Sequence, residues 1–115
     1  MFSLIFPGQG SQIIGMGKEF YDKFDLVKNL FKKADETLDI PLSKIILEGP
    51  KEQLDLTINT QPAIFLISYS IFKVAKEEFN IELNKAKYFA GHSLGEYSAL
   101  ASAGYLSFSE TIKLL

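Results

Sequence analysis

The chain of 115 residues contains no cysteine and no arginine, and its single histidine is His92. The lack of cysteine excludes disulfide bonds, thiolate catalysis and cysteine-ligated metal sites, and we expect no metal site. All 12 basic residues are lysines, so the chain offers no guanidinium group for bidentate pairing with a carboxylate. Any chemistry that needs a histidine base has one candidate in this sequence.

The sequence also lacks a strong charge of either sign and a long apolar run. A formal net charge of -2 gives no electrostatic basis for binding nucleic acid or an anionic membrane. The longest apolar stretch, 62–75, is interrupted by Ser68, Ser70 and Lys73, and it is shorter than the roughly 20 residues of a membrane span. The N-terminus has no basic segment typical of a signal peptide. We therefore expect a cytoplasmic protein without nucleic-acid or membrane partners.

Two short apolar runs predict buried strands at 2–6 and 87–90, and helical patterns occupy most of the chain between them. The longest predicted helix covers 60–79, with Pro62 in its first turn. Ser107 and Glu110 fit a capping box at the start of a further helix. A long helical crossover makes the two strands parallel, and parallel sheets are buried inside larger assemblies. The pattern predicts an α/β fold, with residues 1–115 as the N-terminal part of a longer domain.

The second strand runs into Gly-His-Ser-Leu-Gly at 91–95, followed by small residues that favour a helix. This pattern is typical of a nucleophile elbow, in which a sharp turn between strand and helix exposes a serine. We predict that Ser93 is the nucleophile and that the Leu94 amide, at the start of the helix, donates to an oxyanion. The alternative interpretation is an ordinary turn that contains serine.

A glycine-rich loop, Gly-Gln-Gly-Ser-Gln at 8–12, follows the first strand. If the strands are neighbours, both loops emerge at the same edge of the sheet, and Gln9 also donates to the oxyanion. The alternative is a tight turn into a helix. His92 is adjacent to Ser93, so their side chains diverge, and we predict a structural role for His92 and a base from elsewhere. Gln61, at a helix entrance, is either a cap or a polar group facing a pocket.

Four sequence motifs together resemble malonyl-CoA:acyl carrier protein transacylase, and the resemblance is collinear over the whole chain. They are Phe-Pro-Gly-Gln-Gly-Ser-Gln at 6–12, Gly-Met-Gly at 15–17, Thr-Gln-Pro-Ala at 60–63 and Gly-His-Ser-Leu-Gly-Glu-Tyr-Ser-Ala at 91–99. Related acyltransferase domains of polyketide and animal-type fatty acid synthases share these features. The resemblance implies an α/β-hydrolase-like core.

The resemblance also implies the roles of particular residues. Ser93 takes a malonyl group from malonyl-CoA, which is a substrate and not a cofactor, and passes it to the phosphopantetheine thiol of acyl carrier protein in fatty acid biosynthesis. Gln9 and the Leu94 amide match the oxyanion-hole positions. Gln61 matches a polar position near the pocket, and His92 lies within the serine motif.

The sequence differs from this family in extent. The family's catalytic histidine, the arginine that pairs with the malonyl carboxylate and a ferredoxin-like subdomain all lie downstream of the serine motif. The resemblance therefore implies that residues 1–115 are the N-terminal part of the acyltransferase domain, without the downstream core and the subdomain. Two alternatives stay open: a serine esterase or thioesterase with the same elbow, and a non-catalytic fragment that only folds or binds a partner.

Overall fold

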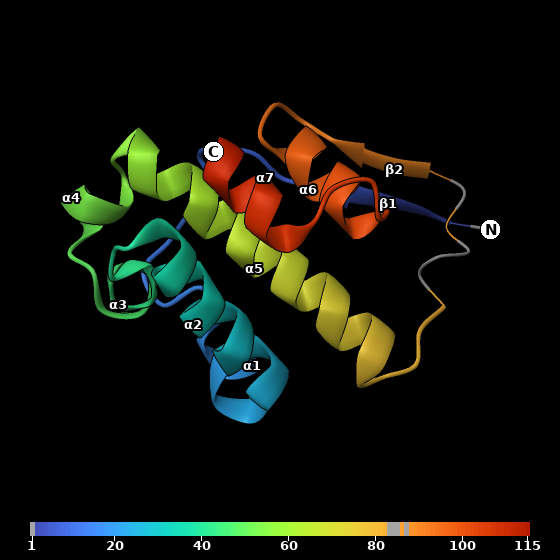
Figure 1. Cartoon of the computed structure of the whole chain (residues 1–115), viewed down its shortest axis with the longest axis horizontal. Coiled ribbons are helices and arrows are strands. Elements are labelled where there is room, and N and C mark those ends of the chain that lie inside the picture. The colour runs from blue at the N-terminus through green and yellow to red at the C-terminus, as the bar shows by residue number, and fades with distance from the viewer. Residues whose placement is uncertain (1, 83–85, 87) are drawn as a thin grey trace.

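A computed structural model describes residues 2–82, 86 and 88–115. Its elements follow the order β1 (Ser3–Phe6), α1 (Lys18–Lys23), α2 (Asp25–Leu38), α3 (Leu42–Glu48), α4 (Lys51–Leu54), α5 (Thr57–Glu77), β2 (Tyr88–Gly91), α6 (Gly95–Ser102) and α7 (Phe108–Leu114). Helices cover one side of a small parallel sheet (Figure 1). The predicted α/β class is confirmed.

The two strands pair in parallel, with Ser3 opposite Tyr88 and Phe6 opposite Gly91. This pairing confirms the prediction of neighbouring parallel strands, and the described part of the second strand extends to Gly91, one residue beyond the predicted 87–90. The predicted first residue, Lys87, lies outside the described residues. Because Phe6 and Gly91 end their strands side by side, the loops that follow them start at one edge of the sheet.

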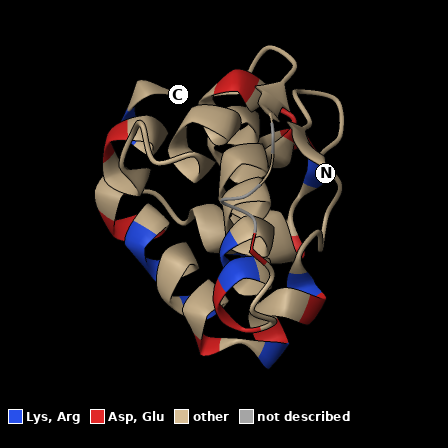
Figure 2. Cartoon of the chain, turned by 90° about the vertical axis from the view of Figure 1, so that its right-hand side faces the viewer, with Lys and Arg blue, Asp and Glu red and all other residues tan. Residues whose placement is uncertain are grey.

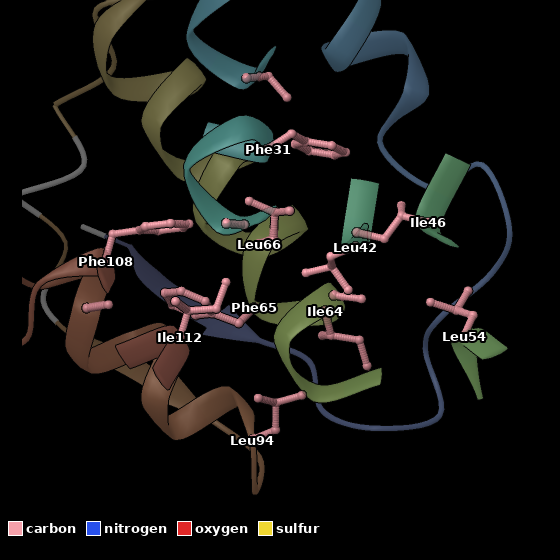
Figure 3. Close-up of a cluster of buried hydrophobic side chains, with 14 of the residues drawn as sticks. Phe31, Leu42, Ile46, Leu54, Ile64, Phe65, Leu66, Leu94, Phe108 and Ile112 are labelled. Carbon is pink, nitrogen blue, oxygen red and sulfur yellow. The ribbon is translucent and has the colours of Figure 1, made fainter. Parts of the chain in front are cut away.

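Helix α5 forms the centre of the molecule (Figure 1). Its segment 63–66 is entirely apolar, and Ala63, Phe65 and Leu66 are fully buried. The surrounding core draws side chains from α2, α3, α4, α6 and α7 (Figure 3). The stacked rings of Phe65 and Phe108, 5.5 Å apart between centroids, join α5 to α7 within this core.

The start of α5 differs from the prediction, because the helix begins at Thr57 and Pro62 lies inside it. The additional turn is stabilised by bonds that do not involve the proline nitrogen. The Thr60 amide and hydroxyl both donate to the Leu56 carbonyl, at 2.8 and 2.9 Å. The Asn59 side chain donates to the Gln53 carbonyl at 2.8 Å. These bonds extend the helix toward the N-terminus, so proline is tolerated beyond the first turn.

The sheet is covered on one face. Phe6 packs with Phe72 of α5 and Ala99 of α6, so both helices lie on the same side of the strands. Side chains alternate along a strand, and Ile5, which belongs to the opposite face, is 80% exposed. Between β1 and the flank of α5 lies an apolar groove of about 450 Å³, to which Ile67 contributes.

The last helix confirms the predicted capping box. The Ser107 hydroxyl accepts a hydrogen bond from the Glu110 amide at 3.1 Å and donates to the Glu110 carboxylate at 2.8 Å. Helix α7 therefore starts where the sequence predicts. Within the described part of the chain, no helix is long and apolar enough to cross a membrane.

Candidate active site

Ser93 lies in a tight turn between β2 and α6 and has a φ of 55°, in the left-handed region that residues with a side chain rarely adopt. Backbone bonds fix the turn: the His92 amide donates to the Phe6 carbonyl at 3.3 Å, and the Gly95 amide donates to the His92 carbonyl at 2.9 Å. The Ser93 side chain is exposed. The strand and the helix therefore hold the serine hydroxyl at the surface, in a strained conformation.

The two glycines that flank this turn have no room for a side chain. A Cβ placed on Gly91 would lie 1.9 Å from the Gly95 carbonyl oxygen. A Cβ on Gly95 would lie 2.3 Å from the Phe6 carbonyl oxygen. These contacts are with backbone atoms, so a larger residue at either position requires the backbone to move. The spacing of glycines around Ser93 thus reflects the close approach of β1, β2 and α6.

The side chain of Leu94 is 3% exposed and belongs to the hydrophobic core (Figure 3). Its backbone precedes the first residue of α6, where helix amides lack intrahelical partners. None of the residues that the structure describes accepts a hydrogen bond from the Leu94 amide. Burial of the side chain therefore anchors a free donor next to Ser93.

The glycine-rich loop after β1 lies against the same turn. A Cβ on Gly8 would lie 2.6 Å from the His92 carbonyl oxygen, so the loop backbone passes directly over the residue before Ser93. The Gln9 side-chain amide donates to the Thr57 hydroxyl at 3.4 Å. Gln61 follows Thr57 by four positions in α5, so the two share one helix face. The structure thus brings Gln9 and Gln61 to the same side of the molecule.

His92 and Ser93 do not interact through their side chains. Among the described residues, no hydrogen bond links the imidazole to the serine hydroxyl, and Nδ1 of His92 lies 3.7 Å from a Cβ built on Gly8. The part of the chain that the structure describes also contains no cluster of acidic, histidine or cysteine side chains suited to a metal. Figure 2 shows both signs of charge interspersed along the outer helices.

A set of hydrogen bonds in the glycine-rich loop was not predicted from the sequence. The Gln12 side chain accepts from the Gly10 amide at 2.8 Å and donates to the Asp55 carboxylate at 3.1 Å. Lys51 donates to the other carboxylate oxygen of Asp55 at 2.5 Å. The hydrogen bonds from Lys51 and then Gln12 lower the pKa of the Asp55 carboxyl group. The Lys51–Asp55 spacing of four residues was the available signal, but nothing in the sequence links this pair to Gln12.

The model of the acyl transferase domain family matches residues 3–115. An acyl transferase domain is thus the class that agrees with the α/β fold and with the exposed serine between β2 and α6. The chain belongs to the acyl transferase domain family.

Within this family, the chain is similar to several individual malonyltransferases. The malonyl CoA-acyl carrier protein transacylase of Bacillus subtilis (strain 168) is 49% identical over 110 residues, which are 96% of this chain and 33% of the relative. The crystal structure of an acyl carrier protein S-malonyltransferase from Vibrio cholerae matches 98% of this chain with a TM-score of 0.92 and 42% identity, over 36% of its own chain. A malonyl-transacylase in complex with a type II PKS acyl-carrier protein gives a TM-score of 0.88 at 40% identity, over 98% of this chain and 36% of its own. The chain spans about a third of the length of the relatives it matches.

Proposed function

We propose that this chain is the N-terminal part of a malonyl-CoA:acyl carrier protein S-malonyltransferase and carries its nucleophile, Ser93. The observation that supports this most directly is the left-handed φ of 55° at Ser93, in a turn enclosed by glycines that contact neighbouring backbone. A strained, exposed serine between a strand and a helix is the geometry of a nucleophile elbow. Because the chain belongs to the acyl transferase domain family, the group that this serine would bind covalently is an acyl group.

In the proposed reaction, the Ser93 Oγ attacks the thioester carbonyl carbon of malonyl-CoA, loses its proton to a base, and expels the thiol of coenzyme A. The malonyl ester on Ser93 is then attacked by the phosphopantetheine thiol of acyl carrier protein, which restores the serine hydroxyl. Negative charge develops on the carbonyl oxygen in each step. In this proposal the Leu94 amide, which has no partner among the described residues, and a donor from Gln9 stabilise that charge.

The base and the partner of the malonyl carboxylate lie outside these 115 residues in the proposed enzyme. The His92 imidazole makes no hydrogen bond with the Ser93 hydroxyl, and the chain has no other histidine and no arginine. The relatives are about three times as long as this chain, which leaves room for both groups downstream. Gln61 is a polar side chain near the pocket in this proposal, and His92 supports the turn.

The exposed parts of the sheet support a larger α/β-hydrolase-like domain. Ile5 on the uncovered face is 80% exposed, and the groove beside β1 is lined mainly by apolar side chains. Parallel sheets are stable when both faces are covered. We therefore propose that residues 1–115 form the first part of that core and that further strands and a ferredoxin-like subdomain belong to the downstream part.

Intact mass measurement after incubation with malonyl-CoA tests the proposal. The chain is measured alone and mixed with the remaining two-thirds of the Bacillus subtilis relative, supplied as a separate polypeptide, with Ser93→Ala as the control in both cases. We expect a malonyl adduct on the mixed sample that Ser93→Ala abolishes, and its transfer to holo acyl carrier protein. Persistence of the adduct in Ser93→Ala contradicts the assignment of the nucleophile. Release of the adduct to water, with no transfer to the carrier thiol, identifies a thioesterase instead.

A further inference from the structure

The glycine-rich loop beside Ser93 is held by one side chain that bonds in two directions. Gln12 accepts from the Gly10 amide at 2.8 Å through Oε1 and donates to Asp55 Oδ1 at 3.1 Å through Nε2. We propose that Gln12 and Asp55 are positioning residues that set the orientation of the peptide between Gln9 and Gly10, and with it the oxyanion donors beside Ser93. This inference rests on the acyl transfer proposed above.

The chemistry of the contacts fixes which way the Gln12 amide points. An ionised carboxylate only accepts hydrogen bonds, so the amide nitrogen must face Asp55. The Gly10 amide only donates, so the amide oxygen must face the loop. Among uncharged side chains, only a carboxamide supplies an acceptor and a donor in this fork, and Gln12 has the length that reaches both partners.

The bond to Gly10 determines the orientation of the adjoining peptide. In a trans peptide the N–H and C=O point in opposite directions, so the Gln9 carbonyl is directed away from Gln12. Gly10 has a φ of 109°, which glycine adopts easily but does not maintain without a restraint. Gln12 provides that restraint for the residue predicted to contribute to the oxyanion hole.

Asp55 is itself fixed to the end of α4. Its carboxylate accepts from Lys51 at 2.5 Å, and its backbone amide donates to the Lys51 carbonyl at 2.9 Å. The same two side-chain hydrogen bonds, from Lys51 and Gln12, keep the pKa of Asp55 low, so the carboxylate stays charged at neutral pH. The loop is thereby joined to a helix that also packs against α5.

The resonance of the Gly10 amide proton in NMR spectra tests the positioning directly. We expect an upfield shift of this proton in Gln12→Ala, because the hydrogen bond is lost, and a smaller shift in Asp55→Asn. Asp22→Asn is the matched control: it removes an exposed ion pair of the same i,i+4 kind, Lys18–Asp22 at 2.6 Å, which makes no hydrogen bond with Gln12 or Gly10. An unchanged Gly10 resonance in Gln12→Ala overturns the proposal.

The rate of Ser93 acylation tests the consequence for the reaction, in the mixed sample described above. Misplacing one oxyanion donor lowers the rate constant, and we expect about a tenfold loss in Gln12→Ala at saturating malonyl-CoA, with little change in the half-saturating concentration. Asp22→Asn retains the rate of the unchanged chain. A rate in Gln12→Ala equal to that of the unchanged chain overturns the proposal.

A pH series separates positioning from a general loss of structure. In Gln12→Glu the new carboxylate repels Asp55 at neutral pH, but once protonated it donates to Asp55 and still accepts from Gly10. Lys51, whose Nζ lies 2.5 Å from Asp55 Oδ2, is the other charged side chain at this contact. Because the ordinary pKa of a glutamate side chain is about 4.3, the acylation rate of Gln12→Glu relative to the unchanged chain should rise several-fold between about pH 6.5 and 4.5. The same ratio for Gln12→Ala should stay flat.

A flat ratio for Gln12→Glu overturns the proposal. If the unchanged chain forms no adduct in either sample, the proposed acyl transfer fails. The Gly10 resonance alone then decides whether Gln12 orients the loop.

Discussion

Replacing Ser93, the proposed nucleophile, by glycine should relax the backbone of the turn between β2 and α6. A residue with a Cβ loses about 1–2 kcal/mol in the left-handed region, where Ser93 has a φ of 55°. Glycine avoids that loss but gives up about 0.5–1 kcal/mol more chain entropy on folding. We therefore expect Ser93→Gly to exceed Ser93→Ala in free energy of unfolding by about 0.5–1 kcal/mol. Both variants lack the hydroxyl, so the comparison isolates the backbone.

Urea denaturation followed by circular dichroism measures this difference. With a typical slope of about 1–2 kcal/mol per molar urea, the midpoint of Ser93→Gly should lie about 0.5 M above that of Ser93→Ala. Ala103→Gly is the matched control, since Ala103 is exposed and right-handed, with a φ of -77°. The same alanine-to-glycine change is expected to lower stability there by about 0.5–1 kcal/mol.

If Ser93 is strained, glycine should be more stabilising than alanine at position 93 and less stabilising than alanine at position 103. A Ser93→Gly variant no more stable than Ser93→Ala would show that the turn stores no backbone strain. The geometric argument for a nucleophile elbow would then lose its main support. A gain of stability at both positions would point to an effect of glycine unrelated to φ.

Three further predictions concern packing and charge. Gly91→Ala should lower the free energy of unfolding by about 3 kcal/mol, because its methyl group would lie 1.9 Å from the Gly95 carbonyl oxygen. Gly104→Ala, which meets no atom within 4 Å, should lose only about 1–2 kcal/mol through its left-handed φ, and equal losses in urea denaturation would refute the steric argument. Phe65→Ala should cost about 3–5 kcal/mol by the same assay, because this fully buried ring leaves a cavity; a loss below 1 kcal/mol would contradict its place in the core. The lowered pKa of Asp55 means that its contribution to stability is present above the unfolded pKa, near pH 4, and is lost as the pH falls through the folded pKa. The urea midpoint of Asp55→Asn should accordingly fall less steeply below pH 4 than that of the unchanged chain, and identical slopes would refute this.

The sequence predicted the parts of the fold that depend on local patterns. The apolar runs before two glycine motifs predict the strands, and the long helix between them makes the strands parallel, as the pairing of Phe6 with Gly91 shows. The capping box at Ser107 depends only on neighbouring residues, and it forms as predicted. Local signals are sufficient in these cases because each element buries one face or caps one end.

The features that escaped prediction depend on contacts between distant residues. Helix α5 starts before Pro62 because Asn59 and Thr60 bond to carbonyls that precede the helix, which propensity does not reveal. The bond from Gln12 to Asp55 joins positions 43 residues apart. No periodicity relates such positions, so the link between the glycine-rich loop and α4 becomes visible only in three dimensions.

The backbone conformation of the Ser93 turn and the removal of the Ser93 hydroxyl proton depend on different groups. The turn is held by backbone contacts with β1, β2 and α6, such as the hydrogen bond from the His92 amide to the Phe6 carbonyl. Contacts within the 115 residues thus set the conformation of Ser93 and leave the Leu94 amide without a hydrogen-bond partner among the described residues. Deprotonation of the Ser93 hydroxyl lacks such a nearby group, because the imidazole of His92 makes no hydrogen bond with that hydroxyl. Since a positioned base contributes about 10²–10⁴-fold, the chain alone should acylate at Ser93 slowly, and the added downstream polypeptide should raise the rate by that factor.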